Sequence, residues 1–254
     1  MVIQTARDGP RTLVSEGDLD VARRWASVTK AAVAFGAAAM VAAREVEYGL
    51  TAGPEGATLA HLLAHASGLG LEASDRTMAV GSRRIYSNVG IDLAVEALAH
   101  GQPHGTWMRD WVFAPLEMTD TKLLGRAAFG VVGPLTDVAA LGTALASSGA
   151  IETSRAQMVA PFLPELAGVV PGFGRFDPCW WGLGVEVHGA KRHWMGSVAT
   201  SSAYGHFGQS STLLLVDPDA SLVVAAASEE PFGAWARDLW PRWMDEVMTW
   251  GIGQ

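Results

Sequence analysis

A serine and a lysine stand three positions apart in the segment WASVTK, which runs from Trp25 to Lys30 and leads into a long alanine-rich run. A helix places residues i and i+3 on one face, so Ser27 and Lys30 can lie within hydrogen-bond reach at a helix amino terminus. A serine hydroxyl is a weak nucleophile until a base takes its proton, and burial among apolar residues lowers the pKa of a lysine enough for that task. This spacing favours covalent catalysis on Ser27 with Lys30 as the base.

A pair this short also has a plain structural interpretation, in which Ser27 caps the helix and Lys30 is solvated. In the catalytic interpretation, backbone N–H groups at the helix start would stabilise the oxyanion that forms when Ser27 attacks a carbonyl. Two later segments favour catalysis. They are Tyr86-Ser-Asn88 and, at the start of a predicted strand, Gly205-His206-Phe207-Gly208.

In their order and kind, these segments resemble the serine β-lactamase and penicillin-binding protein superfamily, most closely its class C β-lactamase-like esterases. The similar stretches, between about Trp25 and Ser228, are SVTK, TLAHLLAHASGL, YSNVGIDLAVEAL, FAPLEMTDT, WGLGVEV and GHFGQSSTLLLVDPDASLVVAAAS. The resemblance implies an α+β fold of the β-lactamase/transpeptidase type, a five-stranded antiparallel sheet flanked by helices with an inserted helical subdomain. Residues 1–57 and 166–254 would form the sheet subdomain and residues 58–165 the mostly helical one, within one catalytic domain.

The resemblance implies a role for each matching residue. Ser27 is the expected acylated nucleophile, Lys30 its proton acceptor and Tyr86 the general acid/base. Asn88 is the expected amide that holds Lys30 and the substrate. The backbone N–H groups of Ser27 and Gln209 would form the oxyanion hole.

Two expectations concern the surroundings of these groups. Because neighbouring cations favour a phenolate, we expect Tyr86 to lose its proton well below the pKa of about 10 of a free tyrosine. Gly208 is expected to be glycine because a side chain there would crowd an acyl group lying along the strand.

His206 and Phe207 depart from the family pattern, since penicillin-recognising members usually carry Lys-Thr-Gly or Lys-Ser-Gly here. That lysine and hydroxyl bind the carboxylate of the substrate, whereas a mostly neutral histidine and a phenylalanine do not. We therefore expect a serine hydrolase that cleaves a small neutral ester or amide. For His206 two roles stay open: orienting Tyr86 or Ser27, and contacting the substrate directly.

Two alternatives to the esterase or amidase remain. The first is a β-lactamase or D-alanyl-D-alanine carboxypeptidase with an atypical third motif. The second is a non-catalytic ligand-binding module of the same fold. Burying Lys30 without a task would be costly through desolvation, which argues against the second.

The elements that must position these residues come from both ends of the chain. VIQTA and RTLVSE alternate around Asp8-Gly9-Pro10, which predicts a hairpin. WGLGVEVHG, AYGHFGQSSTLLLVD and SLVVAAAS predict three further strands, and LLLV and LVVAAA lack alternation, so helices should cover both sheet faces. A closing amphipathic helix over about 232–250 would supply one cover. Residues 58–164 read as helices and loops without a strand-rich block.

Composition limits the partners. The 254 residues are 49% hydrophobic, enough for a sizeable core, and the net charge of -8 opposes binding to nucleic acid or to anionic membrane surfaces. The apolar run 31–43 is too short to span a membrane, and the start of the chain has no signal-peptide pattern, so we expect a cytoplasmic protein. The expected partner is a small-molecule ester or amide, and the sequence does not determine the oligomeric state.

No cofactor or metal is expected. His61 and His65 stand at i and i+4, a spacing that zinc can use, but neither a carboxylate nor a third ligand is placed nearby. Cys179 is the single cysteine and cannot form an intramolecular disulfide, so it reads as a small buried side chain.

Overall fold

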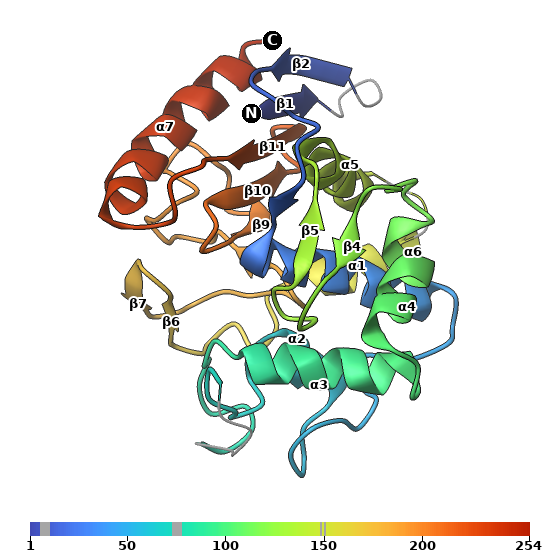
Figure 1. Cartoon of the computed structure of the whole chain (residues 1–254). Helices are drawn as coiled ribbons and strands as arrows, with labels where there is room; N and C mark the ends of the chain where they lie inside the picture. Colours follow the sequence, from blue (N-terminus) through green and yellow to red (C-terminus); the bar gives the residue numbers. More distant parts are fainter. Residues whose placement is uncertain (6–10, 73–77, 148, 150) are drawn as a thin grey trace.

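The computed structural model describes residues 1–5, 11–72, 78–147, 149 and 151–254, and the predicted turn at Asp8-Gly9-Pro10 lies outside them. At its centre is a six-stranded antiparallel sheet with the order β2-β1-β11-β10-β9-β8 (Figure 1). The strands are β1 (Val2–Thr5), β2 (Arg11–Ser15), β8 (Glu186–Val187), β9 (Tyr204–Phe207), β10 (Thr212–Asp217) and β11 (Leu222–Ala227). Both ends of the chain therefore contribute to one sheet, as the sequence predicted.

The sheet has one strand more than the five expected. The additional strand arises because AYGHFGQSSTLLLVD, predicted as one strand, forms β9 and β10, which pair with each other antiparallel. Of the predicted strand WGLGVEVHG, only the two-residue β8 pairs with β9. Gly184 has a φ of +90°, so the chain turns immediately before β8 and the segment cannot form one continuous strand.

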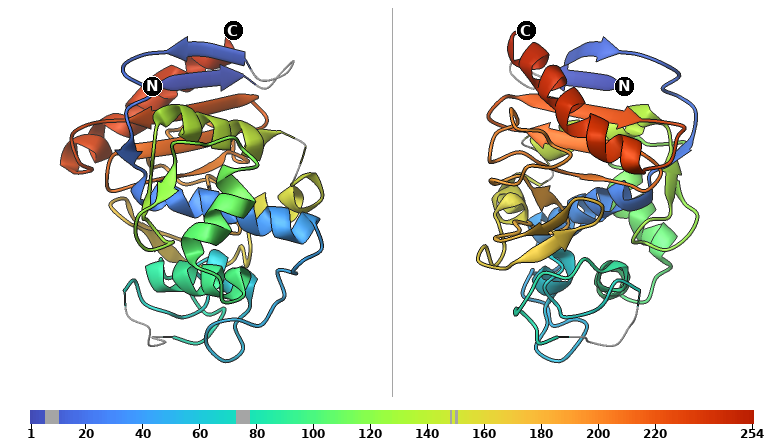
Figure 2. Two further views of the ribbon diagram at one scale, coloured as in Figure 1. Left: turned by 45° about the vertical axis from the view of Figure 1, so that its right-hand side comes forward. Right: turned by 90° about the vertical axis from the view of Figure 1, so that its left-hand side faces the viewer.

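Helices cover both faces of the sheet, as the apolar strands predicted. Leu213 and Leu215 face the cluster that includes α7 (Ala234–Ile252), whereas Leu214 and Val216 face the cluster that includes α5 (Leu135–Ala146). The two helices lie on opposite sides of the sheet in Figures 1 and 2. The closing helix is confirmed, two residues further along the chain than its predicted range at both ends.

The alanine-rich run forms α1 (Thr29–Ala42), which follows the short 3-10 turn η1 (Ala26–Val28). All residues of α1 from Thr29 to Met40 are buried, because its small side chains allow the sheet and the other helices to approach closely. The remaining helices are α2 (Leu59–Leu63), α3 (Asn88–Ala99), α4 (His104–Met108), the π-helical turn η2 (Arg109–Phe113) and α6 (Glu152–Val159). None of the described helices is long and apolar enough to cross a membrane.

Short strands complete the structure. β3 (Arg23–Arg24), β5 (Val131–Gly133) and β4 (Lys122–Leu123) form a small sheet in that order, and β6 (Gly168–Val170) pairs with β7 (Gly174–Phe176). The sequence did not predict β4 and β5, each of which has at most three residues. The division into residues 1–57 with 166–254 and 58–165 stays a prediction.

Arg84 ties together three segments around the strand-like stretch that leads into the Tyr86 motif. Its side chain is 3% exposed, and its guanidinium donates to the carbonyl oxygens of Cys179 (2.6 Å), Ala64, Phe162 (2.7 Å) and Leu163 (3.1 Å). Burial lowers its pKa to about 10, which leaves it charged at neutral pH. The planar fork of arginine suits this arrangement, since one group can donate in several directions at once.

We expect Arg84→Lys to lower the free energy of unfolding by roughly 2–3 kcal/mol, because one ammonium cannot serve all these carbonyls and some stay buried without a donor. Urea denaturation followed by tryptophan fluorescence measures the change. The neighbouring exposed Arg83 supplies the control, and Arg83→Lys should alter the same quantity by less than about 0.5 kcal/mol. Equal stabilities of the two variants would contradict the assigned role of Arg84.

Candidate active site

Ser27 lies in η1, just before α1 rather than within it. The preceding Ala26 has a φ of +44°, a strained value for a residue with a side chain and one that is typical of functional turns. Trp25 anchors this turn to β5: its backbone N–H donates to the Val131 oxygen (2.9 Å) and its indole N–H donates to the Gly133 oxygen (3.2 Å). The hydroxyl is thus presented by a short turn held against a strand.

The amine of Lys30 is fully buried and lies within hydrogen-bond distance of three oxygens. Its Nζ lies 3.3 Å from Ser27 Oγ, 2.8 Å from Asn88 Oδ1 and 2.9 Å from the backbone oxygen of Ala128. The predicted contact across one helical turn is therefore present. The interpretation of Ser27 as a helix cap and Lys30 as a solvated side chain is wrong, because the cap position of α1 is Val28 and Lys30 is 0% exposed.

Burial lowers the pKa of Lys30 to about 7. The carboxylates of Asp92 and Glu72 act in the opposite direction, and Arg126 adds to the lowering. A large fraction of the amine is therefore uncharged near neutral pH. An uncharged amine within hydrogen-bond distance of Ser27 can accept its proton.

The expected phenolate at Tyr86 is wrong. Burial raises the pKa of Tyr86 above its usual value, and the carboxylates of Glu186 and Glu72 raise it further, while a hydrogen bond with Ser27 lowers it only in part. One cation that the prediction relied on is Lys30, whose Nζ lies 4.8 Å from the centre of the Tyr86 ring but which loses its charge around neutral pH because its pKa is lowered to about 7. Tyr86 is therefore a protonated phenol beside the Ser27 hydroxyl.

The start of α3 positions Tyr86 and Asn88. Ser87 caps this helix: its Oγ accepts from the backbone N–H of Gly90 (2.9 Å) and donates to the Gly70 oxygen (2.7 Å). The backbone N–H of Asn88 donates to the Leu71 oxygen at 2.9 Å. The residues from Tyr86 to Asn88 therefore form the turn that begins α3 and also carry two of the expected site side chains.

The side-chain amide of Asn88 is held from both ends. Its oxygen accepts from Lys30, and its Nδ2 donates to Glu72. Glu72 also pairs with Arg126, and these two hydrogen bonds lower the pKa of Glu72 although burial alone would raise it. The sequence predicted the contact with Lys30 but not Glu72, which no motif marks.

His206 is buried and neutral. Its Nδ1 lies 2.8 Å from the Phe207 oxygen, and a carbonyl can only accept, so Nδ1 carries the proton and Nε2 is left as an acceptor. Burial lowers the pKa of His206 to about 3, and the nearby Lys30 contributes. His206 therefore supplies no positive charge where penicillin-recognising members of the superfamily carry a lysine, as the sequence predicted.

Gly208 is required for a reason other than the one expected. A Cβ on Gly208 would lie 2.5 Å from the Trp25 oxygen and 3.0 Å from the Ser27 nitrogen. The backbone of the turn that carries Ser27 therefore already excludes a side chain at Gly208, without any acyl group being present. The same contact shows that the Ser27 N–H lies against the end of β9, where Gln209 follows. This placement brings the two expected oxyanion-hole residues to one side of a common cavity.

The cavity has a volume of about 280 Å³. Of the four expected catalytic or amide side chains, Ser27, Tyr86 and Asn88 line the cavity, and Lys30 is buried beside it. The full lining is Ser27, Leu71, Glu72, Tyr86, Asn88, Val170, Pro171, Trp181, Glu186, His206, Phe207 and Gln209. Besides Glu72, sequence reasoning missed Glu186 and His65. The nitrogen Nδ1 of His65 accepts from the Ser87 N–H at 3.2 Å, and its ring lies 4.6 Å from that of Tyr86.

Glu186 is a buried carboxylate in the lining of the cavity. It accepts from Lys191 (2.8 Å) and from the Trp194 indole (2.8 Å), and His193 Nε2 lies 2.8 Å from it. Burial alone would raise the pKa of Glu186, but Lys191 and His193 outweigh it and hold the pKa well below its usual range. A glutamate inside the apolar segment WGLGVEV, with a lysine five residues later, was the available signal for this ion pair.

Among the described residues, no group of three or more His, Cys, Asp and Glu side chains is arranged to hold a metal ion. His61 instead pairs with Thr58, at 2.8 Å between Nδ1 and Oγ1, and Cys179 is buried.

Comparisons with known proteins agree with this geometry. The family model described as Beta-lactamase matches residues 20–248. Among solved structures, a beta-lactamase from Mycobacterium bovis has 34% sequence identity and a TM-score of 0.94, with 99% of this chain and 94% of that chain covered. A search of curated proteins found no match.

Two more distant structures share the fold alone. Simvastatin synthase (LovD) from Aspergillus terreus, in a mutant form, has 15% identity and a TM-score of 0.75, with 100% of this chain and 91% of that chain covered. EstCE1, described as a hydrolase with promiscuous acyltransferase activity, has 17% identity and a TM-score of 0.72, with 99% and 91% covered.

The lowered pKa of Lys30 predicts a specific dependence of stability on pH. Between about pH 7 and 10 the unfolded state binds a proton at Lys30 that the folded state does not, so the wild type gains stability as the pH rises. Lys30→Met removes this pH-dependent contribution to stability, because methionine has no titratable group. The free energy of unfolding of the wild type should therefore increase relative to the variant, by up to about 1.4 kcal/mol per pH unit.

Chemical denaturation at several pH values measures this difference. The exposed Lys122 gives the control, because Lys122→Met should leave the pH profile parallel to that of the wild type. A profile of Lys30→Met that also ran parallel would show that Lys30 is charged in the folded protein.

Proposed function

The chain belongs to the beta-lactamase family, and we propose that it is a serine hydrolase that cleaves a small ester or amide through a covalent acyl-enzyme on Ser27. One observation carries this proposal: the fully buried amine of Lys30 lies 3.3 Å from Ser27 Oγ and has a pKa of about 7. An amine in this state has the position and the basicity that activation of a serine requires.

In the proposed acylation, Ser27 Oγ attacks the substrate carbonyl carbon while its proton passes to Lys30. The developing oxyanion accepts hydrogen bonds from the N–H groups of Ser27 and Gln209. The phenol of Tyr86 donates its proton to the leaving oxygen or nitrogen and regains one from the ammonium of Lys30. The products are the acyl-enzyme and the free alcohol or amine, with Lys30 neutral and Tyr86 protonated as at the start.

Deacylation runs in reverse with water in the place of the leaving group. Water attacks the acyl carbon as its proton passes to Tyr86, the Tyr86 proton passes to Lys30, and Lys30 returns a proton to the departing Ser27 oxygen. Because the pKa of Tyr86 is raised, the phenol acts as a relay in a concerted transfer and does not exist as a free phenolate.

The surroundings favour a substrate without a carboxylate near Ser27. His206 is neutral, Phe207 has no hydroxyl, and the carboxylates of Glu72 and Glu186 line the cavity. Within the part of the chain that the structure describes, the acceptor Nε2 of His206 has no hydrogen-bond partner, which supports contact with a donor on the substrate such as a hydroxyl or N–H group. The β-lactamase alternative is kept because the Mycobacterium bovis relative is described as a beta-lactamase.

Incubation with p-nitrophenyl acetate or a fluorophosphonate should add one acyl or phosphonyl group to Ser27, detected by intact mass and peptide mapping. Ser27→Ala should carry no adduct and lose at least about 10³-fold in kcat, because no other described group replaces the nucleophile. The exposed Ser82 is the control, and Ser82→Ala should keep both properties. An adduct elsewhere, or an active Ser27→Ala, would contradict the assignment of the nucleophile.

The same preparations separate the alternatives. Faster turnover of a chromogenic cephalosporin than of short esters would favour the β-lactamase or carboxypeptidase. Acylation of Ser27 without release would favour the binding module, whereas repeated turnover excludes it.

The pH dependence of kcat/KM for a neutral ester should follow the base. We expect a rise with an inflection near pH 7, as Lys30 loses its proton, and a plateau to about pH 9, because Tyr86 stays protonated. Tyr86→Phe should lower kcat and leave the inflection in place. Initial rates between pH 5.5 and 9.5 provide the measurement. A rate that kept increasing above pH 9 would assign the essential base to the phenol instead.

A further inference from the structure

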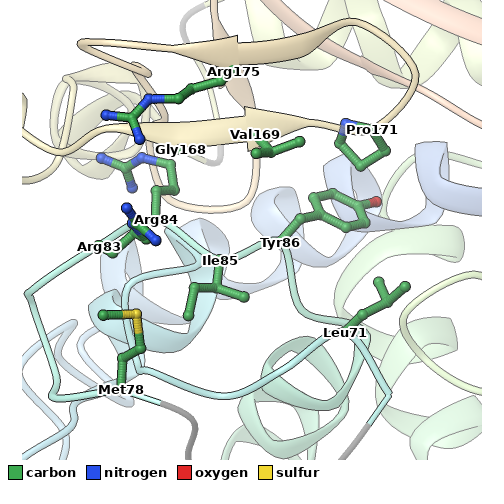
Figure 3. Close-up of a pocket in the computed structure, with 10 residues that line it drawn as sticks. All are labelled: Leu71, Met78, Arg83, Arg84, Ile85, Tyr86, Gly168, Val169, Pro171 and Arg175. Atoms are coloured by element: carbon green, nitrogen blue, oxygen red, sulfur yellow. The ribbon is translucent and has the colours of Figure 1, made fainter.

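A second cavity, of about 440 Å³, adjoins the active-site cavity. The two share Leu71, Tyr86 and Pro171 as lining residues. Figure 3 shows the lining residues of this second cavity: the Tyr86 hydroxyl points toward the end where Pro171 lies, and Ile85, Met78 and Val169 lie around the space nearer the Tyr86 backbone. The volume is within the range of cavities that bind small molecules.

The lining offers apolar surface. Ile85, Met78 and Val169 present carbon and sulfur. Three arginines also line the cavity: the guanidinium of Arg84 is engaged with backbone carbonyl oxygens, Arg175 pairs with Asp177 at 3.1 Å, and Arg83 is exposed. Val169 is 54% exposed although its strand neighbours Gly168 and Val170 are buried. An exposed valine beside a catalytic cavity leaves apolar area that a substrate can cover.

One wall of the cavity, formed by β6 and β7, is held in place by close packing. The backbone N–H of Arg84 donates to the Ala167 oxygen at 3.0 Å, and a Cβ on Gly168 would lie 2.8 Å from Arg84 Cβ and 2.9 Å from the Arg84 oxygen. The β6–β7 hairpin is therefore packed directly against the segment before Tyr86. A wall fixed in this way binds a chain without first having to be ordered.

We propose that this cavity binds the alkyl chain of the leaving alcohol of an ester, so that the substrate class is the esters of medium-length primary alcohols. The proposal rests on the proposed function, in which Tyr86 gives its proton to the leaving oxygen. A chain attached to that oxygen starts at the Tyr86 hydroxyl and continues along the ring, between Leu71 and Pro171, into the apolar space (Figure 3).

Two ester series test the proposal. For ethyl, butyl and hexyl acetates, kcat/KM of the wild type should rise roughly fourfold for each added methylene, the equivalent of about 0.8 kcal/mol. For the ethyl esters of butanoate and hexanoate it should stay within about twofold of ethyl acetate, because the acyl chain points away from the cavity. A rise carried by the acyl chain, or by neither chain, would overturn the proposal.

Val169→Trp should fill the cavity from an exposed position and flatten the rise for the acetates. Val198, 37% exposed and not among the lining residues, supplies the control, and Val198→Trp should keep the rise. If Val169→Trp preserved the wild-type dependence on alcohol length, the cavity would not be the alcohol subsite.

Calorimetry with hexan-1-ol separates failure of this proposal from failure of the hydrolase assignment. Binding to the wild type and to Val198→Trp, with loss in Val169→Trp, would support the subsite even if no ester were turned over. Absence of binding to the wild type, or equal binding to both variants, would overturn the subsite while an acyl adduct on Ser27 still upheld the hydrolase.

Discussion

The exclusion of water from the amine of Lys30 is the constraint on which the rest of the site depends. An exposed lysine would stay charged at neutral pH and could not accept a proton from Ser27. Here the small side chains of α1 let the sheet and the helices close around the amine, and Asn88 and Ala128 supply oxygens that fix its direction. The same alanine-rich helix thus provides burial, position and basicity.

Charged groups around the site are paired, which keeps Lys30 from being driven back to its charged form. Glu72 and Asp92 favour the ammonium, but both pair with Arg126, whose charge has the opposite effect. The charge of Glu186, in the lining of the cavity, is compensated by Lys191. Two carboxylates can therefore line a site that needs an uncharged amine, and their presence discourages a substrate carboxylate.

The sequence predicted what depends on local geometry and on residue order. The spacing of Ser27 and Lys30 is a property of one helical turn, and apolar strands without alternation predicted a sheet covered on both faces. It could not predict the ionisation of Tyr86, because the distance of a phenol from water and from carboxylates far along the chain is not a local property. The contact of Gly208 with the turn at Trp25 could not be predicted either, because the two segments lie far apart in the sequence.

Glu72 and Glu186 were missed for a related reason: a carboxylate is marked as functional by its partners, and those partners are set by the fold. The strand predicted over WGLGVEV is longer than the observed β8, because the pattern of the segment gave no sign of the turn at Gly184, where φ is +90°.

The seating of the nucleophile turn against the end of β9 joins the beginning of the polypeptide to a part synthesised much later. Ser27 leaves the ribosome well before Gly208, and β1 must wait longer still for β11, with which it pairs Val2 to Ala225. Contacts between residues so far apart in the sequence form slowly, because the long intervening chain must first lose entropy. A nascent or truncated chain that lacks β9 therefore carries Ser27 and Lys30 without the strand end against which the turn at Ser27 packs, so the proposed chemistry at Ser27 requires a chain that extends at least through β9.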